Sequence, residues 1–370
     1  MNLSYWEVKT YLSQVDYAIV GSGIVGLNCA LRLRAQHPNA KIIILERGVF
    51  PQGASTKNAG FACFGSLSEI VDDLNSHSEA EVFDLVNRRV KGLNLLRNTL
   101  GDSGINYKGF GGYELFTEEH RETYSTCLEQ LDRINTLLSP IFSAPVFKVA
   151  TNNFGFKNTV AQLVYNAFEG QIDTGQMMNA LLTLARKNSI EIINTCEVKS
   201  FEDFGSGVSI KTTAFDFKCK KLFIANNGFA SQLITEKVRP ARAQVLITKP
   251  IKNLKIKGTF HLDKGYYYFR NIDDRVLFGG GRNLDFKTEE TTAMTTTALI
   301  QNKLEQLLQE VILPDTAFEI DRRWSGIMGV GSQKKSIVKP LSTNVYCGVR
   351  LGGMGVAIGS LVGQELADLL

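Results

Sequence analysis

The sequence lacks several features that would place it in other classes of protein. It has no uninterrupted run of about 18 apolar residues, the length needed to cross a bilayer, so no integral membrane association is expected. Residues 1–16 have neither the long apolar run nor the small-residue cleavage site of a secretory signal. We therefore expect a cytoplasmic protein.

Cysteine and histidine are scarce and are not spaced as ligands. None of the 6 cysteines forms a Cys-x-x-Cys pair, and none of the 4 histidines stands in a His-Glu-x-x-His spacing. These absences argue against a disulfide framework and a zinc knuckle, and no metal site is predicted. Free thiols in a reducing compartment fit the pattern best.

The chain also has almost no excess of charge of one sign. The 370 residues include 41 Lys or Arg and 37 Asp or Glu, which gives a net charge of +4. A nucleic-acid-binding module usually has a denser basic footprint, so the charge balance does not favour a nucleic-acid partner. The length suits about two domains, each with its own core.

A dinucleotide-binding pattern is present near the N-terminus. The short apolar strand Asp16–Val20 leads into Gly21-Ser22-Gly23-Ile24-Val25-Gly26, a G-x-G-x-x-G motif, and helical periodicity follows. A second apolar strand, Lys41–Leu45, ends at Glu46. This order of elements predicts a bound dinucleotide; the alternative is a glycine-rich turn that binds nothing.

Each part of the motif has a physical reason. Gly21 permits the tight turn out of the strand, Gly23 lets a pyrophosphate approach the backbone, and Gly26 lets helix and strand pack closely. The helix N-terminus offers free N–H groups and a positive dipole end to phosphates. The carboxylate of Glu46 is placed to accept hydrogen bonds from ribose hydroxyls.

The segment after Glu46 is rich in small residues. Arg47 follows, and then comes Gly53-Ala54-Ser55-Thr56-Lys57-Asn58-Ala59-Gly60-Phe61. Its glycines would let backbone lie close to a flat ligand, and Ser55, Thr56 and Asn58 add short hydrogen-bonding side chains. An ordinary surface loop is an equally good interpretation of this segment by itself.

At these segments and at its C-terminus, the sequence resembles the D-amino-acid oxidase superfamily of FAD-dependent oxidoreductases. The similarity is to the glycine oxidase, sarcosine oxidase and D-amino-acid dehydrogenase branch. The resemblance implies an α/β fold with a Rossmann-type FAD-binding domain and an interleaved α+β substrate domain that contains a mainly antiparallel sheet. The FAD-binding domain would comprise residues 14–75, 155–235 and 325–370, and the substrate-binding domain residues 76–154 and 236–324.

The resemblance also implies how the C-terminus contributes. A strand, Asn344–Val349, precedes Arg350-Leu351-Gly352-Gly353-Met354-Gly355-Val356 and a final helix, whose positive end would face the flavin. Cys347 lies within that strand, so non-covalent FAD is expected. The cofactor-binding residues would be Gly21, Gly23, Ile24, Val25, Gly26, Glu46, Arg47, Ala54, Ser55, Asn58, Ala59, Gly60, Val198, Asn226, Gly228, Gly326, Arg350, Gly352, Gly353, Met354, Gly355 and Val356.

Helices and strands of the substrate side show in the sequence pattern. Ser78-x-x-Glu81 is a capping box ahead of an apolar stripe that Gly101 ends. Further patterns predict a strand over 109–117 and a helix over 118–138, and, in the expected FAD-binding segment 155–235, a helix over 176–187 and a strand over 190–198. Two strands flank a hairpin turn at residues 271–274.

A carboxylate substrate needs a cation, usually an arginine. The candidates are Arg270, Arg282 and Arg350, and Tyr268 could orient substrate through its hydroxyl. Each arginine has an alternative as a surface or ion-pair residue, Tyr268 as a buried strand residue, and His261 is expected to be structural.

The predicted function is FAD-dependent oxidation of the C–N bond of a small amino acid or secondary amine, with hydride transfer to flavin N5. Alternatives are modification of a tRNA wobble-uridine side chain, oxidation of a 2-hydroxy acid or glycerophosphate, and a flavin-binding subunit without turnover. The electron acceptor would be O2, a quinone or another carrier. Sarcosine oxidases use a lysine to assist oxygen, whereas this chain places Leu277 or Phe278 there, which favours a dehydrogenase.

Overall fold

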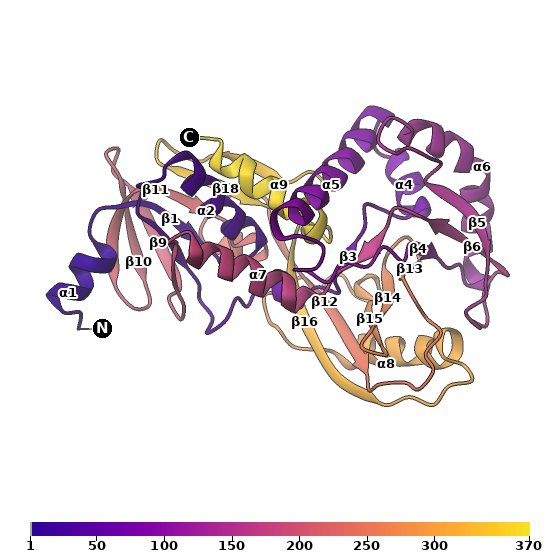
Figure 1. Ribbon diagram of the computed structural model, residues 1–370. Helices are drawn as coiled ribbons and strands as arrows, with labels where there is room; N and C mark the ends of the chain where they lie inside the picture. The colour runs from indigo at the N-terminus through magenta and orange to yellow at the C-terminus, as the bar shows by residue number, and fades with distance from the viewer. Residues whose placement is uncertain (1) are drawn as a thin grey trace.

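The computed structural model describes residues 2–370, and they form two large sheets of eight strands each (Figure 1). In the first sheet, β1 lies at the centre between β2 and β11, and both pairings are parallel. All four residues of β2 are buried, as expected of a strand that is covered on both faces. The strands of this sheet are β1 (Val15–Val20), β2 (Ile42–Leu45), β8 (Glu191–Ile193), β9 (Val198–Asp203), β10 (Val208–Thr212), β11 (Asp216–Ile224), β17 (Ile337–Pro340) and β18 (Val345–Val349).

Four helices share one core with one face of the first sheet: α2 (Ile24–Gln36), α5 (Glu79–Leu100), α7 (Thr174–Lys187) and α9 (Gly355–Ala367). Small residues let them approach closely. A Cβ on Gly363 of α9 would lie 2.6 Å from the carbonyl oxygen of Val25 in α2, and one on Gly92 of α5 would lie 2.2 Å from that of Ala357. The opposite face shares a second core with β9 and β10, the antiparallel strands that continue this sheet from β11, and with the 3-10 helix η3 (Asn227–Gln232).

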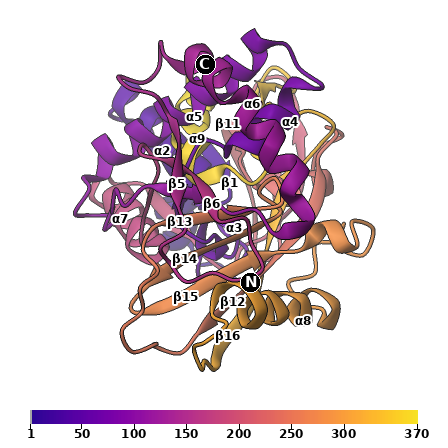
Figure 2. The same cartoon turned by 90° about the vertical axis from the view of Figure 1, so that its right-hand side faces the viewer.

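The second sheet is mainly antiparallel, in the order β16-β12-β15-β14-β13-β4-β6-β5, with one parallel pair between β4 and β13. One face packs against α8 (Ala298–Leu307) and the π-helix η5 (Leu308–Ile312), and Figure 2 shows α8 beside β12 and β16. The strands are β4 (Gly112–Glu114), β5 (Phe147–Thr151), β6 (Gln162–Asn166), β12 (Arg239–Thr248), β13 (Thr259–Leu262), β14 (Tyr267–Ile272), β15 (Arg275–Gly280) and β16 (Ile320–Val330).

Two further helices, α4 (Leu67–Leu74) and α6 (Arg121–Leu138), share a core with β5 and β6. Short elements complete the fold: α1 (Tyr5–Glu7), the π-helix η1 (Val8–Leu12), α3 (Ala54–Lys57), β3 (Phe61–Ala62), which pairs with β7 (Gly170–Gln171), and the 3-10 helices η2 (Glu118–His120) and η4 (Arg282–Leu284). The mixed α/β architecture, with parallel central strands in the first sheet and a second, mainly antiparallel sheet, confirms the predicted fold class.

Several local predictions are confirmed by backbone geometry. The capping box of Ser78 and Glu81 is formed at the start of α5, and Gly101 ends that helix with φ of 73°. The β14–β15 hairpin turns at Asp273 and Asp274, with φ of 47° and 56°. Two successive left-handed residues match the twist of the flanking strands, which is why short polar residues suit this turn.

Other predicted elements differ in extent. The strand expected over 190–198 is interrupted, because Thr195 adopts a left-handed φ of 53° between β8 and β9. The strand expected over 109–117 is reduced to β4, since Gly111 has a φ of 81° just before it. The helix expected over 118–138 begins as the 3-10 helix η2 before α6.

Sheet membership and the expected domain limits do not coincide everywhere. The FAD-binding segment was expected over 155–235, yet β6 pairs with β4 and β5 in the second sheet. Likewise α5, from the expected substrate segment 76–154, packs against α9 through Gly92. Thus β6 belongs to the second sheet, whereas α5 packs with the helices on the first sheet. Within residues 2–370, no helix combines the length and apolar character that a membrane crossing needs.

Candidate active site

A cavity of about 550 Å³ is lined by residues from both sheets. Val20 and Leu45 reach it from the carboxyl ends of β1 and β2, and Val245 and Tyr268 reach it from β12 and β14. The carboxyl ends of parallel strands are where open α/β sheets bind ligands. The cavity therefore lies where a dinucleotide site is expected.

Most of the predicted cofactor residues meet in this cavity. The exceptions are Gly26 and Gly228, which serve close packing: a Cβ on Gly26 would lie 2.0 Å from the carbonyl oxygen of Gly21, and one on Gly228 would lie 2.6 Å from that of Met328. The lining includes Gly21, Gly23, Ile24, Val25, Glu46, Arg47, Ala54, Ser55, Asn58, Ala59, Gly60, Val198, Asn226, Gly326, Arg350, Gly352, Gly353, Met354, Gly355 and Val356.

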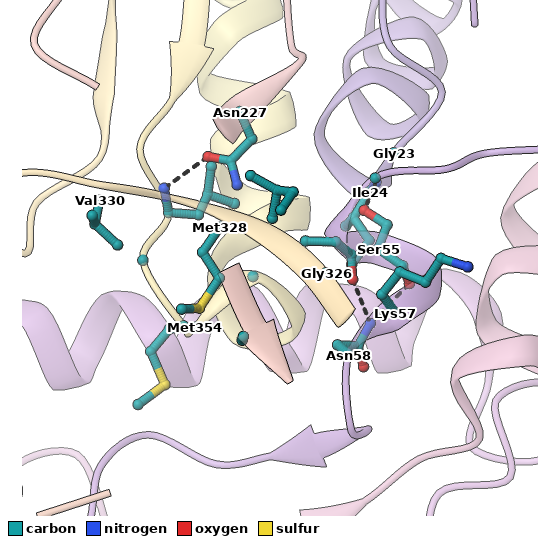
Figure 3. Close-up of a pocket in the computed structure, with 18 of the residues that line it drawn as sticks. Gly23, Ile24, Ser55, Lys57, Asn58, Asn227, Gly326, Met328, Val330 and Met354 are labelled. Carbon is teal, nitrogen blue, oxygen red and sulfur yellow. Dashed lines mark hydrogen bonds between the residues drawn. The ribbon is translucent and has the colours of Figure 1, made fainter. Parts of the chain in front are cut away.

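The glycine turn after β1 is built for an anion. Gly21 takes a φ of 100°, and Gly23 precedes the first turn of α2. The backbone N–H of Ile24 donates to the Ser55 hydroxyl at 3.0 Å, and Figure 3 shows these two residues together at one side of the cavity. Because that hydroxyl accepts this bond, its own hydrogen is available to a phosphate oxygen. With the positive end of α2, the arrangement suits a pyrophosphate.

Glu46 is buried at the end of β2 and is held in place by its neighbours. Its carboxylate accepts from the backbone N–H of Ser22 at 3.1 Å, the Ser22 hydroxyl at 2.7 Å and the N–H of Gly48 at 3.0 Å. These bonds fix the carboxylate at the cavity wall, where its remaining lone pairs can accept ribose hydroxyls. Next to it, the Arg47 guanidinium stacks on Phe229 at 3.6 Å from the ring centroid.

The C-terminal turn leaves backbone exposed to the cavity. A Cβ on Gly352 or Gly355 would meet no atom within 4 Å, and no side chain caps the start of α9 at Met354. The uncapped N–H groups and positive end of α9 thus point to open space. Asn226 Oδ1 is also buried and has no hydrogen-bond partner among residues 2–370. Together with the glycine turn and Glu46, these groups fit FAD.

One row of the second sheet faces the cavity. Strand register places His261 beside Tyr268, Tyr268 beside Gly279, and Gly279 beside Val245. A Cβ on Gly279 would lie 2.7 Å from Cε2 of Tyr268, so the absence of a side chain there makes room for the Tyr268 ring. Burial raises the pKa of Tyr268 to about 12, which keeps its hydroxyl protonated at neutral pH.

The three candidate arginines have different surroundings. Arg282 lines the cavity, and its guanidinium lies 4.7 Å from the Phe286 centroid. Within residues 2–370 its side chain has no hydrogen bond or ion pair, and burial lowers its pKa. Arg350 also lines the cavity, but its side chain donates to the Lys335 carbonyl at 2.9 and 3.0 Å. Arg270 does not line this cavity.

A charged cluster at the cavity was not predicted from the sequence. Glu69 of α4 lies 3.6 Å from Arg89 of α5 and 3.2 Å from Lys334 in the loop after β16. Burial would raise the pKa of Glu69, but the charges of Arg89 and Lys334 outweigh it and lower that pKa. Ser66-x-x-Glu69 has the spacing of a helix start, and Ser66 does cap α4, so α4 could have been found.

Cys347 is not placed for a covalent link. It lies in β18 between β11 and β17, does not line the cavity, and burial raises the pKa of its thiol to about 11. A thiol with such a raised pKa is a poor nucleophile. This supports non-covalent binding of the cofactor.

A comparison with protein families gives a direct match. The family model described as FAD dependent oxidoreductase matches residues 16–369, which is nearly the whole chain. No curated protein matches the chain.

Solved structures with the same fold are numerous. Glycine oxidase from Geobacillus kaustophilus is 20% identical with a TM-score of 0.76, over 96% of this chain and 94% of that one. L-proline dehydrogenase from P. horikoshii is 18% identical with a TM-score of 0.75, over 96% and 93%. Iminodiacetate oxidase from Chelativorans sp. BNC1 is 19% identical with a TM-score of 0.73, over 95% and 94%. At these identities the likeness shows the fold.

Proposed function

The chain belongs to the FAD-dependent oxidoreductase family, and from that premise we propose that it oxidises the C–N bond of a small amino acid or secondary amine that carries a carboxylate. Three proteins whose solved structures share this fold are described as a glycine oxidase, an L-proline dehydrogenase and an iminodiacetate oxidase. Bound FAD supplies the two-electron acceptor for such a reaction. The protein must then bind and orient the substrate and exclude water.

The observation that carries the proposal is the state of Arg282. Its guanidinium lines the cavity without a carboxylate or a hydrogen-bond acceptor among residues 2–370. A half-buried cation in that state is ready to bind an anion, and a substrate carboxylate would receive two parallel hydrogen bonds from it.

The neighbouring aromatic residues shape the rest of the substrate site. Phe61 packs edge-on against both Tyr268 and His261, with centroids 5.5 and 5.3 Å apart, and all three line the cavity. These rings would exclude water from the reacting bond. The Tyr268 hydroxyl, which stays protonated, would donate a hydrogen bond to the bound substrate.

We also propose that the acceptor is a carrier other than O2. Leu277 is buried and packs with Ala59 and Val245. The position at which sarcosine oxidases carry an oxygen-assisting lysine is therefore uncharged in this chain. Slow re-oxidation of the reduced protein by air, set against fast re-oxidation by a quinone, would be the expected result.

Anaerobic bleaching of the flavin band near ~450 nm, the oxidised cofactor's own absorption, tests the reaction. The panel contains amino acids, N-substituted amino acids, 2-hydroxy acids, amines without a carboxylate, and bulk tRNA. Bleaching by carboxylate-bearing amines alone is expected. Bleaching by none, or only by hydroxy acids or tRNA, would overturn the proposal.

Arg282→Met tests the anchor, with Arg275→Met as the matched control. Arg275 lies on β15, the strand that precedes Arg282, and is paired with Asp321 at 2.5 Å. Arg282→Met should raise KM for carboxylate substrates about 100-fold, which corresponds to the roughly 3 kcal/mol of a charged hydrogen-bond pair, and leave FAD content unchanged. The control should leave both unchanged.

A further inference from the structure

Arg270 is a buried cation that forms no ion pair within residues 2–370, although the charges of Asp173 and Asp273 act on it from beyond ion-pair distance. It is 2% exposed on β14. Its guanidinium donates to the carbonyl oxygens of Ala59, Ile172 at 2.9 Å and Asn271 at 3.4 Å. Those acceptors are neutral, and no ion pair of Arg270 occurs within residues 2–370. Burial lowers its pKa to about 10, which still leaves the group charged at neutral pH.

This charge lies directly behind one wall of the cofactor cavity. Ala59 and Gly60 line that cavity, and Arg270 lies on the other side of them. A Cβ on Gly60 would lie 2.7 Å from Nη2 of Arg270 and 2.4 Å from the carbonyl oxygen of Ile172. Only the thickness of one backbone segment therefore separates the guanidinium from the space that FAD fills.

The contacts also connect three parts of the fold. Ala59 belongs to the cofactor loop, Ile172 precedes α7, and Arg270 comes from the second sheet. The Ile172 N–H in turn donates to the Gly60 carbonyl at 2.9 Å. The guanidinium thus completes a closed set of hydrogen bonds that fixes the backbone of Ala59 and Gly60.

We propose that Arg270 is a positioning residue that holds this wall and whose buried charge raises the reduction potential of the bound FAD. Reduction adds negative charge to the flavin. A fixed cation across one backbone segment, in a medium of low dielectric, stabilises that charge at no reorganisation cost. The inference rests on FAD binding by the family and not on the proposed substrate.

The alternative role as a substrate anchor does not fit the contacts. An anchor must present free N–H groups to the substrate, whereas the donors of Arg270 are directed to backbone carbonyls and its side chain does not line the cavity. Arg282, in the 3-10 helix η4 that follows β15, has the opposite pattern. The two arginines of this region therefore have separable roles.

Spectroelectrochemical titration of the FAD-loaded protein, without substrate, tests the proposal. Arg270→Met should weaken binding of reduced FAD at least tenfold relative to oxidised FAD, which is a fall of about 30 mV in the two-electron midpoint potential. The control Arg275→Met, whose charge is at the surface and paired with Asp321, should leave the potential unchanged. An unchanged potential in a folded, FAD-loaded Arg270→Met protein would overturn the proposal.

Arg270→Lys provides an independent measurement if the methionine variant does not fold. A buried lysine loses its proton far more readily than an arginine. Relative to the wild type at the same pH, its midpoint potential should match at pH 6.5 and fall by about 30 mV at pH 9.5, again a tenfold change. A difference that does not vary with pH would contradict a role for the charge. Because no substrate is used, failure of the C–N oxidation proposal would leave this result intact.

Discussion

The side-chain amide oxygen of Asn227 accepts a hydrogen bond from the backbone N–H of Arg350 at 3.0 Å, and a second from Leu351 at 3.2 Å. Asn227 follows β11 and Arg350 follows β18, and these strands are parallel neighbours. Both residues adopt a left-handed backbone conformation, with φ of 44° for Asn227 and 65° for Arg350. Figure 3 shows the bond beside the cavity. The pair therefore fixes the shape of the turn that presents Gly352 to Gly355.

Asn227→Ala should weaken FAD binding about tenfold or more. The change removes the acceptor of two backbone N–H groups, at about 1 kcal/mol each, and places alanine in a left-handed conformation that costs about 1–2 kcal/mol. Titration of the apoprotein with FAD, followed by flavin fluorescence, measures the dissociation constant.

Asn227→Asp is the matched control, because it keeps an acceptor oxygen and tolerates a left-handed φ. Its affinity for FAD should stay close to that of the wild type. An alanine variant with unaltered affinity and thermal midpoint would show that the turn keeps its shape without Asn227.

Gly355→Ala should separate cofactor binding from folding. A Cβ at Gly355 would meet no atom of residues 2–370 within 4 Å, and replacing glycine by alanine at a compatible φ stabilises a protein by about 0.4–1 kcal/mol. The apoprotein should keep or gain stability, while FAD affinity falls at least tenfold because the methyl group enters the cofactor cavity. Calorimetry of the apoprotein and FAD titration give the two quantities. Equal affinity in wild type and variant would mean that FAD does not approach this glycine.

Local patterns in the sequence were enough to predict the glycine turn, Glu46 and the start of α5. The residues that interact in these features lie within about 25 positions of each other, such as Gly21 to Glu46 or Ser78 to Glu81. The longer set of cofactor residues was implied by the resemblance to the D-amino-acid oxidase superfamily, and local patterns account only for the glycines at which backbone approaches a ligand.

The roles of the arginines could not be predicted in this way. Arg270 bonds to Ala59 and Ile172, which are 211 and 98 positions away, and Arg282 is distinguished by a side chain without a hydrogen bond or ion pair within residues 2–370. Nothing in the local sequence pattern distinguishes an arginine whose side chain is hydrogen-bonded from one whose side chain is not. Asn227 was missed for the same reason, because its partner Arg350 is 123 positions further along the chain.

His261 and Glu169 form a buried pair at 3.0 Å. Burial alone would lower the pKa of His261, but the charge and hydrogen bond of Glu169, with the charges of Glu114 and Glu69, raise it overall. A raised pKa in the folded state stabilises the protein below the unfolded value of about 6.5, and this stabilisation is lost as pH rises through the folded pKa.

Glu169→Gln should therefore reduce the free energy of unfolding by about 1–3 kcal/mol at pH 6 and by less at pH 9. Urea unfolding at both pH values measures the difference. The control is Asp263→Asn, which alters the more exposed pair of Asp263 and His120 and should have little effect. A Glu169→Gln deficit that is equal at both pH values would contradict the role of His261.

Gly279→Ala should impair the substrate site while FAD stays bound. The added methyl group would lie 2.7 Å from Cε2 of Tyr268 and 2.3 Å from Cγ1 of Val245, and such overpacking typically costs about 1–3 kcal/mol. Since the Tyr268 ring must move, we expect KM for the amine substrate to rise about tenfold, and FAD affinity to change less than twofold. The double variant Gly279→Ala/Val245→Ala relieves the contact with Val245 but not that with Tyr268, so it should regain stability and keep the raised KM. Recovery of KM in the double variant would assign the effect to Val245 and remove Tyr268 from the substrate site.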